Sequence, residues 1–311
     1  ASPPNDNSSP GPGTSRACGE EFVMAAATTT GHATRPYTQG DRDQVLAVID
    51  ADRLPGQPVA TGDMLAEALV GRSPVDGGWW SELDGLRTDV LTDPTGAVAG
   101  AVSYARRPRD GAGVVLWLHG GEDSETVRQL TNHALAGLAG CPVVEAFSFA
   151  SALGLGLEAL PVRHRPVTDR VLREAGFRGE NLWRYMHRPL PVSGLPRAST
   201  IEVTTPDEHS RQLTMRDREQ VLAEATIGLP VAGIGVLWWI SVEPAGRGKG
   251  LGRALLGSAL ELLVGLDAAE VILFVDDDEP GTDRDRTAAN RLYDSAGFRE
   301  IDRLYSYQLL R

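Results

Sequence analysis

The sequence predicts two consecutive α/β domains, each built on a twisted, mixed, mostly antiparallel sheet flanked by helices. Three observations lead to this prediction. Apolar, strand-like segments alternate with amphipathic, helix-like segments over most of the chain. Two short motifs recur at matching places in the order of these segments. A strand in the second half runs into a glycine-rich turn that opens a helix.

Length and composition agree with two folded domains and argue against several functions. The chain has 311 residues, of which 41% are hydrophobic and 23% charged, as in globular domains. No apolar run approaches the roughly 20 residues that cross a membrane, and no segment near the start has the pattern of a signal peptide. A net charge of -12 argues against general nucleic-acid binding, which needs a basic face. We expect a cytoplasmic monomer or homodimer.

The cysteines and histidines give no pattern of a disulfide framework or a metal site. Only two cysteines are present. Cys18 lies in a polar head and Cys141 in an apolar stretch, so both are expected to be reduced and structural. The six histidines are scattered without ligand-like pairing, and no metal cofactor is expected.

Four segments are predicted along the chain. Residues 1–30 are rich in Ser, Pro, Gly, Asn and Thr without a hydrophobic period, and should form a disordered head. Residues 31–190 form the N-terminal domain, 191–199 a linker, and 200–311 the C-terminal domain. The linker is expected because three prolines and a glycine fall within residues 189–196.

In the N-terminal domain, periodicity and end signals predict each element. Helices are expected at Asp41–Ala51, Ser124–Leu138 and Val167–Ala175. Ser124 is the expected cap of the second helix, since a hydroxyl there can accept a free amide of the first turn, and Gly176 ends the third. Strands are expected at Asp89–Thr92, Ala97–Tyr104, Val114–Leu118 and Pro142–Phe149, with Asp93–Gly96 as the first turn.

The C-terminal domain repeats part of this order. Helices are expected at Leu251–Leu263 and Thr287–Ser295. Strands are expected at Val221–Gly228, Gly235–Val242, Glu270–Val275 and Leu304–Leu310. Ala296-Gly297-Phe298-Arg299 repeats Ala175-Gly176-Phe177-Arg178, and the helix beginning near Arg253 echoes the one containing Arg128. Two matched landmarks favour a duplicated domain.

The strongest signal for a site is the turn Arg247–Gly252, which follows the strand Gly235–Val242. Its glycines let successive backbone N–H groups converge on one ligand. The helix N-terminus adds partial positive charge, and Arg247, Lys249 and Arg253 add full charges. Three cations at a helix N-terminus are unfavourable without an anion, so a phosphate-type ligand is predicted.

Other interpretations of this turn fit less well. A glycine-rich connection with solvated basic residues would need no ligand, but the strand, the turn and the helix together fit a phosphate site better. The turn lacks the Gly-Lys-Ser/Thr ending of a Walker A loop. It also does not match the Gly-x-Gly-x-x-Gly pattern with a later acidic residue that dinucleotide-binding folds use.

The arrangement Arg-x-x-Gly-x-Gly after Val-x-Pro, which begins at Val242, resembles the acyl-CoA signature of the GNAT N-acetyltransferase superfamily. Downstream, Leu292-Tyr293 followed by Gly297-Phe298 resembles that family's Leu-Tyr-x-x-x-Gly-Phe element. The resemblance covers about residues 220–311 well and 33–190 as a weaker second copy. The chain is therefore similar to a tandem GNAT protein.

This resemblance implies transfer of an acyl group, acetyl above all, from acyl-CoA to a small-molecule amine. A backbone N–H near the bulge of the fourth strand would polarise the thioester, and Tyr293 would protonate the departing thiolate. Asn290 is implied as a further contact to the cofactor. The pantetheine arm would pair with the main chain of Ile240, Ser241 and Val242. The diphosphate would be held by Arg247, Gly248, Lys249, Gly250, Leu251, Gly252 and Arg253.

The general base stays open among several acids near strand ends. The candidates are Glu224, Glu243 and the run Asp276–Asp278, with Glu224 and Asp276 as first choices. An acid in such a place is more often only solvated. The family frequently has Asn seven residues before the tyrosine, but Arg286 stands there, which puts one cofactor contact in doubt.

The two copies differ in ways that assign them different roles. The N-terminal turn Gly120–Glu125 carries acids where the other copy is basic, and Leu172 takes the place of the tyrosine. This half is predicted to be a scaffold that could still hold a CoA through main-chain amides. The C-terminal copy is short between Ile201 and Val221, where the family usually has two helices that wall the acceptor pocket. Either the N-terminal domain supplies that wall or the segment is shortened.

Two other functions compete with a small-molecule acyltransferase. A catalytically degenerate acyl-CoA sensor or scaffold would bind the cofactor without turnover. Acetylation of a protein is a third possibility, for which no sequence feature speaks. Retention of Tyr293 and of the basic turn favours the enzyme.

Overall fold

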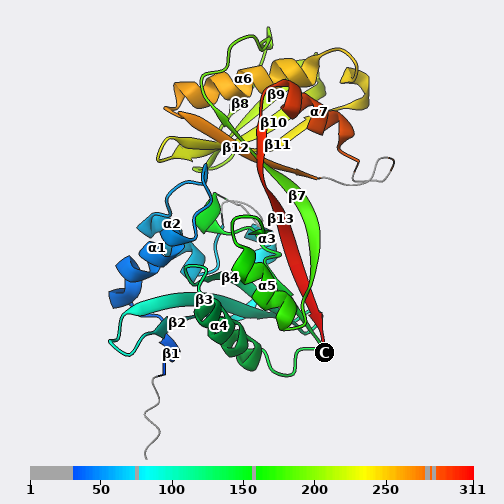
Figure 1. Cartoon of the computed structure of the whole chain (residues 1–311). Helices are drawn as coiled ribbons and strands as arrows, with labels where there is room; N and C mark the ends of the chain where they lie inside the picture. Colours follow the sequence, from blue (N-terminus) through cyan, green and yellow to red (C-terminus); the bar gives the residue numbers. More distant parts are fainter. Residues whose placement is uncertain (1–30, 74–76, 156–158, 277–280, 282–284) are drawn as a thin grey trace, which may run out of the picture. The chain divides into compact units, whose positions relative to one another are not determined.

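The computed structural model describes residues 31–73, 77–155, 159–276, 281 and 285–311. His32–Arg311 is one unit, shown in Figure 1. The expected disordered head and Cys18 lie outside the described residues. None of the helices in the described segments is long and apolar enough to span a membrane.

Helices and strands alternate in the first half as the sequence predicts. Its strands are β1 (Ala33–Pro36), β2 (Asp84–Thr92), β3 (Val98–Arg107), β4 (Ala112–His119), β5 (Val143–Ala146), β6 (Leu160–Pro161) and β7 (Arg178–Pro189). Its α-helices are α1 (Arg42–Ala51), α2 (Gly62–Leu69), α3 (Gly77–Trp80), α4 (Ser124–Gly137) and α5 (Pro166–Glu174). Short 3-10 turns, η1 (Gln39–Asp41) and η2 (Ala152–Gly154), complete this half.

The second half has the same core order with fewer helices. Its strands are β8 (Glu202–Thr204), β9 (Ser210–Asp217), β10 (Gln220–Val231), β11 (Ile234–Val242), β12 (Glu270–Asp276) and β13 (Arg299–Leu310). Its helical elements are η3 (Pro244–Gly246), α6 (Leu251–Gly265) and α7 (Thr287–Ser295). The predicted fold class, a mixed and mostly antiparallel sheet flanked by helices, is confirmed.

Two details of the predicted elements are corrected. Ser124 does not cap α4: the cap is Asp123, whose carboxylate accepts the N–H of Thr126 at 2.8 Å. A carboxylate is the stronger cap there because it also interacts with the positive end of the helix. The strand expected at Pro142–Phe149 is shorter, because β5 ends at Ala146 and Phe147 adopts a positive φ of 58°.

Within the described residues, all strands join one sheet, in which each half exchanges its last strand. The order is β1-β2-β3-β4-β5-β13-β7-β12-β11-β10-β9-β8, with β6 paired to β13. The end of β13 pairs with β5, and β7 pairs with β12. The two strands also pair with each other, antiparallel, and run side by side in Figure 1. The predicted division into 31–190 and 200–311 therefore crosses a continuous ladder of hydrogen bonds, and it stays a prediction.

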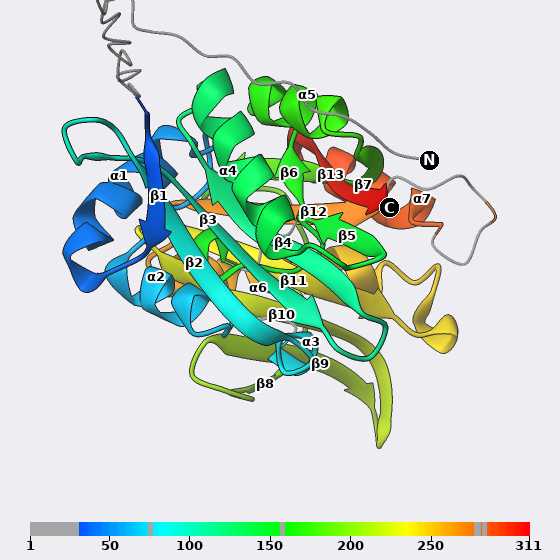
Figure 2. The ribbon, with the colours of Figure 1, turned by 90° about the horizontal axis from the view of Figure 1, so that it is seen from below.

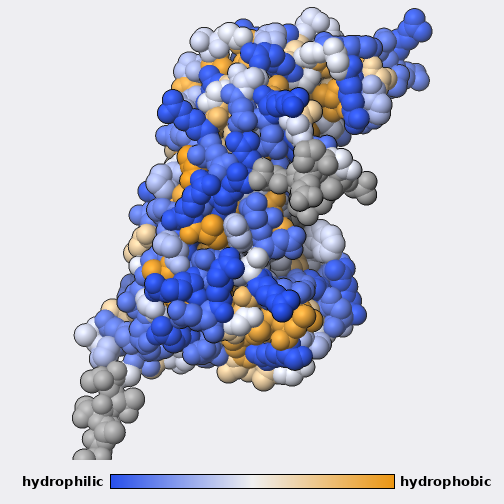
Figure 3. Space-filling model, turned by 45° about the vertical axis from the view of Figure 1, so that its right-hand side comes forward, coloured by the Kyte–Doolittle hydropathy of each residue, from blue (hydrophilic) through white to orange (hydrophobic). Residues whose placement is uncertain are grey.

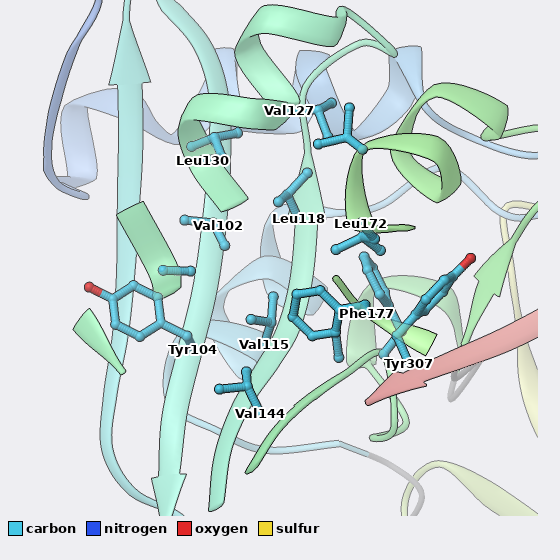
Figure 4. Close-up of a cluster of buried hydrophobic side chains, with 14 of the residues drawn as sticks. Val102, Tyr104, Val115, Leu118, Val127, Leu130, Val144, Leu172, Phe177 and Tyr307 are labelled. Carbon is cyan, nitrogen blue, oxygen red and sulfur yellow. The ribbon is translucent and has the colours of Figure 1, made fainter. Parts of the chain in front are cut away.

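The core of the N-terminal half includes a residue from the far end of the chain. In Figure 4, Tyr307 of β13 lies beside Phe177 and Leu172, within a cluster that also contains Val115 of β4. Its hydroxyl donates to Asp169 of α5 at 2.5 Å. Helix α4 crosses β3 and β4 on this side of the sheet, as Figure 2 shows. Removal of β13 would therefore expose apolar surface in both halves.

The linker packs against the C-terminal half. Leu190, Val192 and Leu195 contact the core cluster under α6, and Ala198 donates its N–H to Ser258 of α6 at 3.0 Å.

Most of the molecular face in Figure 3 is hydrophilic, interrupted by several hydrophobic groups.

The short segment of the C-terminal copy forms a hairpin. Strand β8 leads directly into β9, and the two pair antiparallel. In the N-terminal copy, helices α1, α2 and α3 fill the same interval between β1 and β2. The C-terminal copy thus has only the short connection 205–209 where the family's two helices were expected.

Candidate active site

A wedge opens between two parallel strands of the C-terminal half. Strands β11 and β12 pair only over Ile234–Val236 and Glu270–Ile272, and both continue beyond this pairing. The β12-facing polar groups of β11 beyond Val236 are therefore available for another extended chain, as an exposed strand edge is. A slot of about 140 Å³ lies there, lined by Trp183, Leu237, Trp238, Trp239, Ile240, Phe274, Val275, Asp276, Arg286, Ala289 and Tyr293.

A β-bulge sets the backbone at the head of this slot. Thr226 pairs with Trp239 and Ile227 with Leu237, so Trp238 is the extra residue of β11. Its indole Nε1 donates to the carbonyl of Leu155 at 2.8 Å. Gly228 makes room for the ring, since a Cβ there would lie 2.7 Å from an indole carbon of Trp238. The ring is therefore held from both sides.

The predicted phosphate turn has the geometry of an anion site. Gly248 and Gly250 adopt φ values of 73° and 75°, which glycine tolerates best. The first hydrogen bond of α6 joins the N–H of Ala254 to the carbonyl of Gly250 at 3.1 Å. The amides of Leu251 and Gly252 precede it and, as at any helix start, have no partner within the helix.

The basic side chains surround this helix end, and none of them forms an ion pair with an acid of the described residues. Arg247 and Lys249 are exposed. Arg247 donates from Nε to the carbonyl of Val242 at 3.2 Å, and Arg253 donates to the hydroxyl of Ser295 at 3.0 Å. Both contacts are to neutral acceptors, so the positive charges stay available to a diphosphate.

Tyr293 lies on α7 and lines the slot. The side chain is buried, at 5% exposure, and packs edge-on against Phe298 with ring centroids 5.8 Å apart. Burial raises the pKa of its phenol well above the ordinary value. The group is therefore protonated at neutral pH, as a proton donor must be.

Asp276, one of the two first choices for the base, also lines the slot but is held by neighbours. Its carboxylate accepts the indole N–H of Trp183 at 2.9 Å and pairs with Arg286 at 3.3 Å. Its main-chain carbonyl accepts from the amide of Asn290 at 2.8 Å. Arg286, which replaces the usual Asn of the family, thus has a role in the structure: it balances the charge of Asp276.

Asn290 is engaged within the chain. Its amide nitrogen donates to the carbonyls of Asp276 and Arg286, and its oxygen accepts from Arg184 of β7 at 2.6 Å. These contacts fix α7 to β12 and β7. They make Asn290 a support of the slot wall, and its predicted contact with the cofactor stays a prediction.

Glu224 and the residues Ile240–Val242 lie on neighbouring strands. Glu224 of β10 is paired directly opposite Ser241 of β11, and its carboxylate accepts from Gln212 at 3.4 Å. It does not line the slot. Glu243 follows β11 and is exposed, and Asp277 and Asp278 lie outside the described residues. No group of three or more potential metal ligands occurs in the described part of the chain.

The N-terminal half contains a matching wedge that its own side chains close. Strands β4 and β5 pair in parallel only over Gly113–Val115 and Val144–Ala146, and a bulge at Leu116 corresponds to Trp238. The remaining space is about 60 Å³ and is lined in part by Phe147 and Phe149.

Acidic side chains take the amide donors of this second wedge. Asp52 accepts the N–H of Gly120 at 3.0 Å, the Nδ1–H of His119 at 3.2 Å, and pairs with Arg165 at 3.0 Å. Burial opposes ionisation of Asp52, but the hydrogen bond from His119 and the charge of Arg165 outweigh it and lower its pKa to about 2. Glu122 accepts the N–H of Val167, at the start of α5, at 2.7 Å.

Three residues that shape the two wedges could not be predicted from the sequence. Trp183 comes from β7, which belongs to the first half of the chain, so only the strand exchange could reveal it. Trp238 lies inside the predicted strand, but the β-bulge that makes it the extra residue of β11 cannot be predicted from periodicity. Asp52 follows the end of α1, far in sequence from the Gly120 turn that it closes.

Comparison with known proteins agrees with this geometry. Residues 209–300 match the model of the acetyltransferase (GNAT) domain. A segment of 76 residues is 37% identical to mycothiol acetyltransferase of Renibacterium salmoninarum, covering 24% of this chain and 20% of that protein. The match thus spans about a fifth of the curated relative.

Solved structures match over most of the chain. A tandem GNAT protein from the clavulanic acid biosynthesis pathway aligns with a TM-score of 0.62 and 15% identity, over 90% of this chain and 98% of its own. A GCN5-related N-acetyltransferase from Sphaerobacter thermophilus aligns with a TM-score of 0.55 and 16% identity, over 90% and 95%.

Residues 209–300 are therefore similar to a GNAT acetyltransferase domain. The complete described unit has the fold of a tandem GNAT protein, with this domain in its second half.

Proposed function

We propose that this chain is an acyl-CoA-dependent N-acyltransferase, transferring acetyl in the first instance to a small-molecule amine. Catalysis takes place in the C-terminal half, and the N-terminal half has a structural role. The observation that carries the proposal is the buried phenol of Tyr293 in a slot lined by β11, the strand that leads into the glycine-rich turn before α6.

The residues of the slot have distinct parts in the reaction. The amine nitrogen attacks the thioester carbon, the carbon–sulfur bond breaks, and Tyr293 gives its proton to the thiolate. A main-chain N–H at the Trp238 bulge stabilises the negative charge that develops on the carbonyl oxygen. The proton lost by the amine passes to a base, for which Asp276 and Glu224 stay the candidates.

The structural role of the N-terminal half rests on its closed wedge. A diphosphate would have to compete with Asp52 for the N–H of Gly120 and would approach Glu122 and Asp123 at short range. Two further carboxylates repel a dianionic ligand. This half therefore holds no CoA, and the chain binds one acyl-CoA in total.

The proposal is tested by incubating the purified chain with acetyl-CoA and a panel of amines, and measuring the free thiol of released CoA. We expect amine-dependent release that a Tyr293→Phe variant loses. Tight acetyl-CoA binding with no release for any amine would overturn the enzyme and favour the acyl-CoA sensor.

A further inference from the structure

A large open cavity adjoins the slot on the side of the sheet that faces away from α6. Its volume is about 830 Å³. Helix α2 and η2 of the N-terminal half form one wall, and the ends of β9 and β10 form the other. Its lining residues are Thr61, Asp63, Met64, Glu67, Gly71, Arg72, Ser73, Gly77, Ala152, Leu155, Glu208, His209, Leu229, Val231 and Trp238.

Trp238 lines both this cavity and the thioester slot. The hydrogen bond from its indole to Leu155 and the absence of a side chain at Gly228 fix the ring between the two spaces. A molecule seated in the cavity therefore meets the slot at the bulge, where the thioester would be polarised. The cavity also has the acceptor wall that the short C-terminal copy lacks, because α2 of the N-terminal half forms the wall in place of the family's two helices.

The cavity combines an apolar floor with an acidic rim. Leu155, Leu229, Val231 and Trp238 form the floor. The rim carries three carboxylates, one guanidinium and the imidazole of His209.

One rim carboxylate is already neutralised within the chain. Arg72 holds Glu67 through two hydrogen bonds of 2.6 and 2.7 Å. Asp63 on α2 and Glu208 before β9, which lies 3.5 Å from His209, supply the remaining acidity.

We infer that the acceptor is a small molecule with at least two basic nitrogens joined by an apolar segment. One nitrogen reaches the slot beside Trp238 as the neutral nucleophile, and the other stays protonated at the rim between Asp63 and Glu208. A nitrogen that reacts must have lost its proton, whereas carboxylates at the rim bind a second, cationic group. This inference deepens the proposed function and rests on it.

The test compares acceptors that differ only in the second nitrogen. A series of α,ω-diamines, from 1,4-diaminobutane to 1,8-diaminooctane, is assayed beside the monoamines of equal chain length by acetyl-CoA-dependent thiol release. We expect kcat/KM to be about 10-fold or more higher for the best diamine than for its monoamine, mostly through KM. The Asp63→Asn/Glu208→Gln double variant should remove this difference by raising the KM of the diamine to that of its monoamine. Asp43→Asn, an exposed acid on α1, is the matched control.

A binding measurement keeps the test independent of turnover. Calorimetric titration of the same diamines into the chain saturated with CoA should give a Kd that rises about 10-fold in the double variant and not in Asp43→Asn. Equal kcat/KM for diamines and monoamines, or diamine affinity unaffected by the double variant, would overturn the inference. Failure of every amine to release CoA would overturn the proposed function, and diamine binding that still depends on Asp63 and Glu208 would then mark the cavity as a cation site of a sensor.

Discussion

The two wedges of this chain have the same backbone arrangement, but the side chains around them differ in charge. Each opens where a parallel strand pair separates after three residues, and each has a bulge in its first strand, at Leu116 in one half and Trp238 in the other. In the C-terminal half the helix end beyond the wedge is lined by cations and free amides. In the N-terminal half the corresponding turn carries acids: Asp52 accepts the N–H of Gly120, and Asp123 caps α4.

An internal carboxylate can close a wedge of this kind while the backbone around it stays the same. Amides that converge at a helix start need an anion or water as partner. When a carboxylate of the chain provides that anion, the backbone keeps its geometry and the ligand is no longer required. In the N-terminal half Asp52 is such a carboxylate, and it forms an ion pair with Arg165 inside the chain.

The largest expected effect tests this internal replacement. Asp52→Ala removes the fully buried partner of Arg165, whose side chain is 3% exposed and keeps the half-buried Glu122 at 3.2 Å. Removal of one member of a buried pair costs about 3 to 5 kcal/mol, so urea denaturation should show a loss of that size. The exposed control Asp43→Ala should lose less than about 0.5 kcal/mol. A loss below about 1 kcal/mol for Asp52→Ala would show that the pair does not close the wedge.

The next effect separates catalysis from packing at the position where the halves carry Tyr293 and Leu172. Tyr293→Phe removes the proton donor, so kcat should fall about 100-fold or more while the Kd for acetyl-CoA stays unchanged. Tyr185→Phe is the matched control: that hydroxyl is buried and, in the described part of the chain, has no hydrogen-bond partner. An unchanged kcat in Tyr293→Phe would assign proton donation to another group.

A smaller effect concerns helix α6, which covers the sheet of the C-terminal half as α4 covers the sheet of the N-terminal half. A Cβ at Gly257 of α6 would lie 2.2 Å from the carbonyl oxygen of Pro196 in the linker. Gly257→Ala should therefore destabilise the chain by about 1 to 3 kcal/mol. Gly265→Ala at the end of the same helix meets nothing within 4 Å and should be neutral or slightly stabilising. Thermal denaturation measures both, and equal effects would show that the linker is not docked on α6.

The smallest effect is a pH dependence confined to the N-terminal wedge. Burial lowers the pKa of His119 below its ordinary 6.5, more than the hydrogen bond to Asp52 raises it. As the pH falls below about 6.5, the unfolded chain binds a proton that the folded chain resists, so the free energy of unfolding decreases, by at most about 1.4 kcal/mol per pH unit. His119→Gln should flatten this slope between pH 6.5 and 5 in urea titrations. An unchanged slope would place the titrating group elsewhere.

Periodicity was sufficient for elements whose own residues determine their form. Thr287–Ser295 has the predicted bounds, and the glycine-rich turn lies where the sequence places it, because glycine conformations and helix starts are local properties. The repeated motifs also occupy matching places in the structure. Gly176 and Gly297 each follow a helix, adopt a positive φ and lead into the exchanged strands β7 and β13.

The elements that escaped prediction depend on partners distant in sequence. Strand β7 is rich in charged residues and gives no apolar period. Its Arg184 is satisfied by Glu300 at 2.7 Å and by Asp294 at 3.0 Å, both more than 100 residues away. The acceptor cavity likewise needs α2 and β10 from different halves, and no sequence pattern joins them.

The most direct test of this account counts the acyl-CoA molecules bound per chain by native mass spectrometry. The account predicts one acetyl-CoA for the wild-type chain and none, at the same concentrations, for a folded variant with Arg247→Ala, Lys249→Ala and Gly250→Val. Two bound molecules in the wild type, or one retained by the triple variant, would contradict the assignment of the open wedge to the cofactor and the closed one to structure.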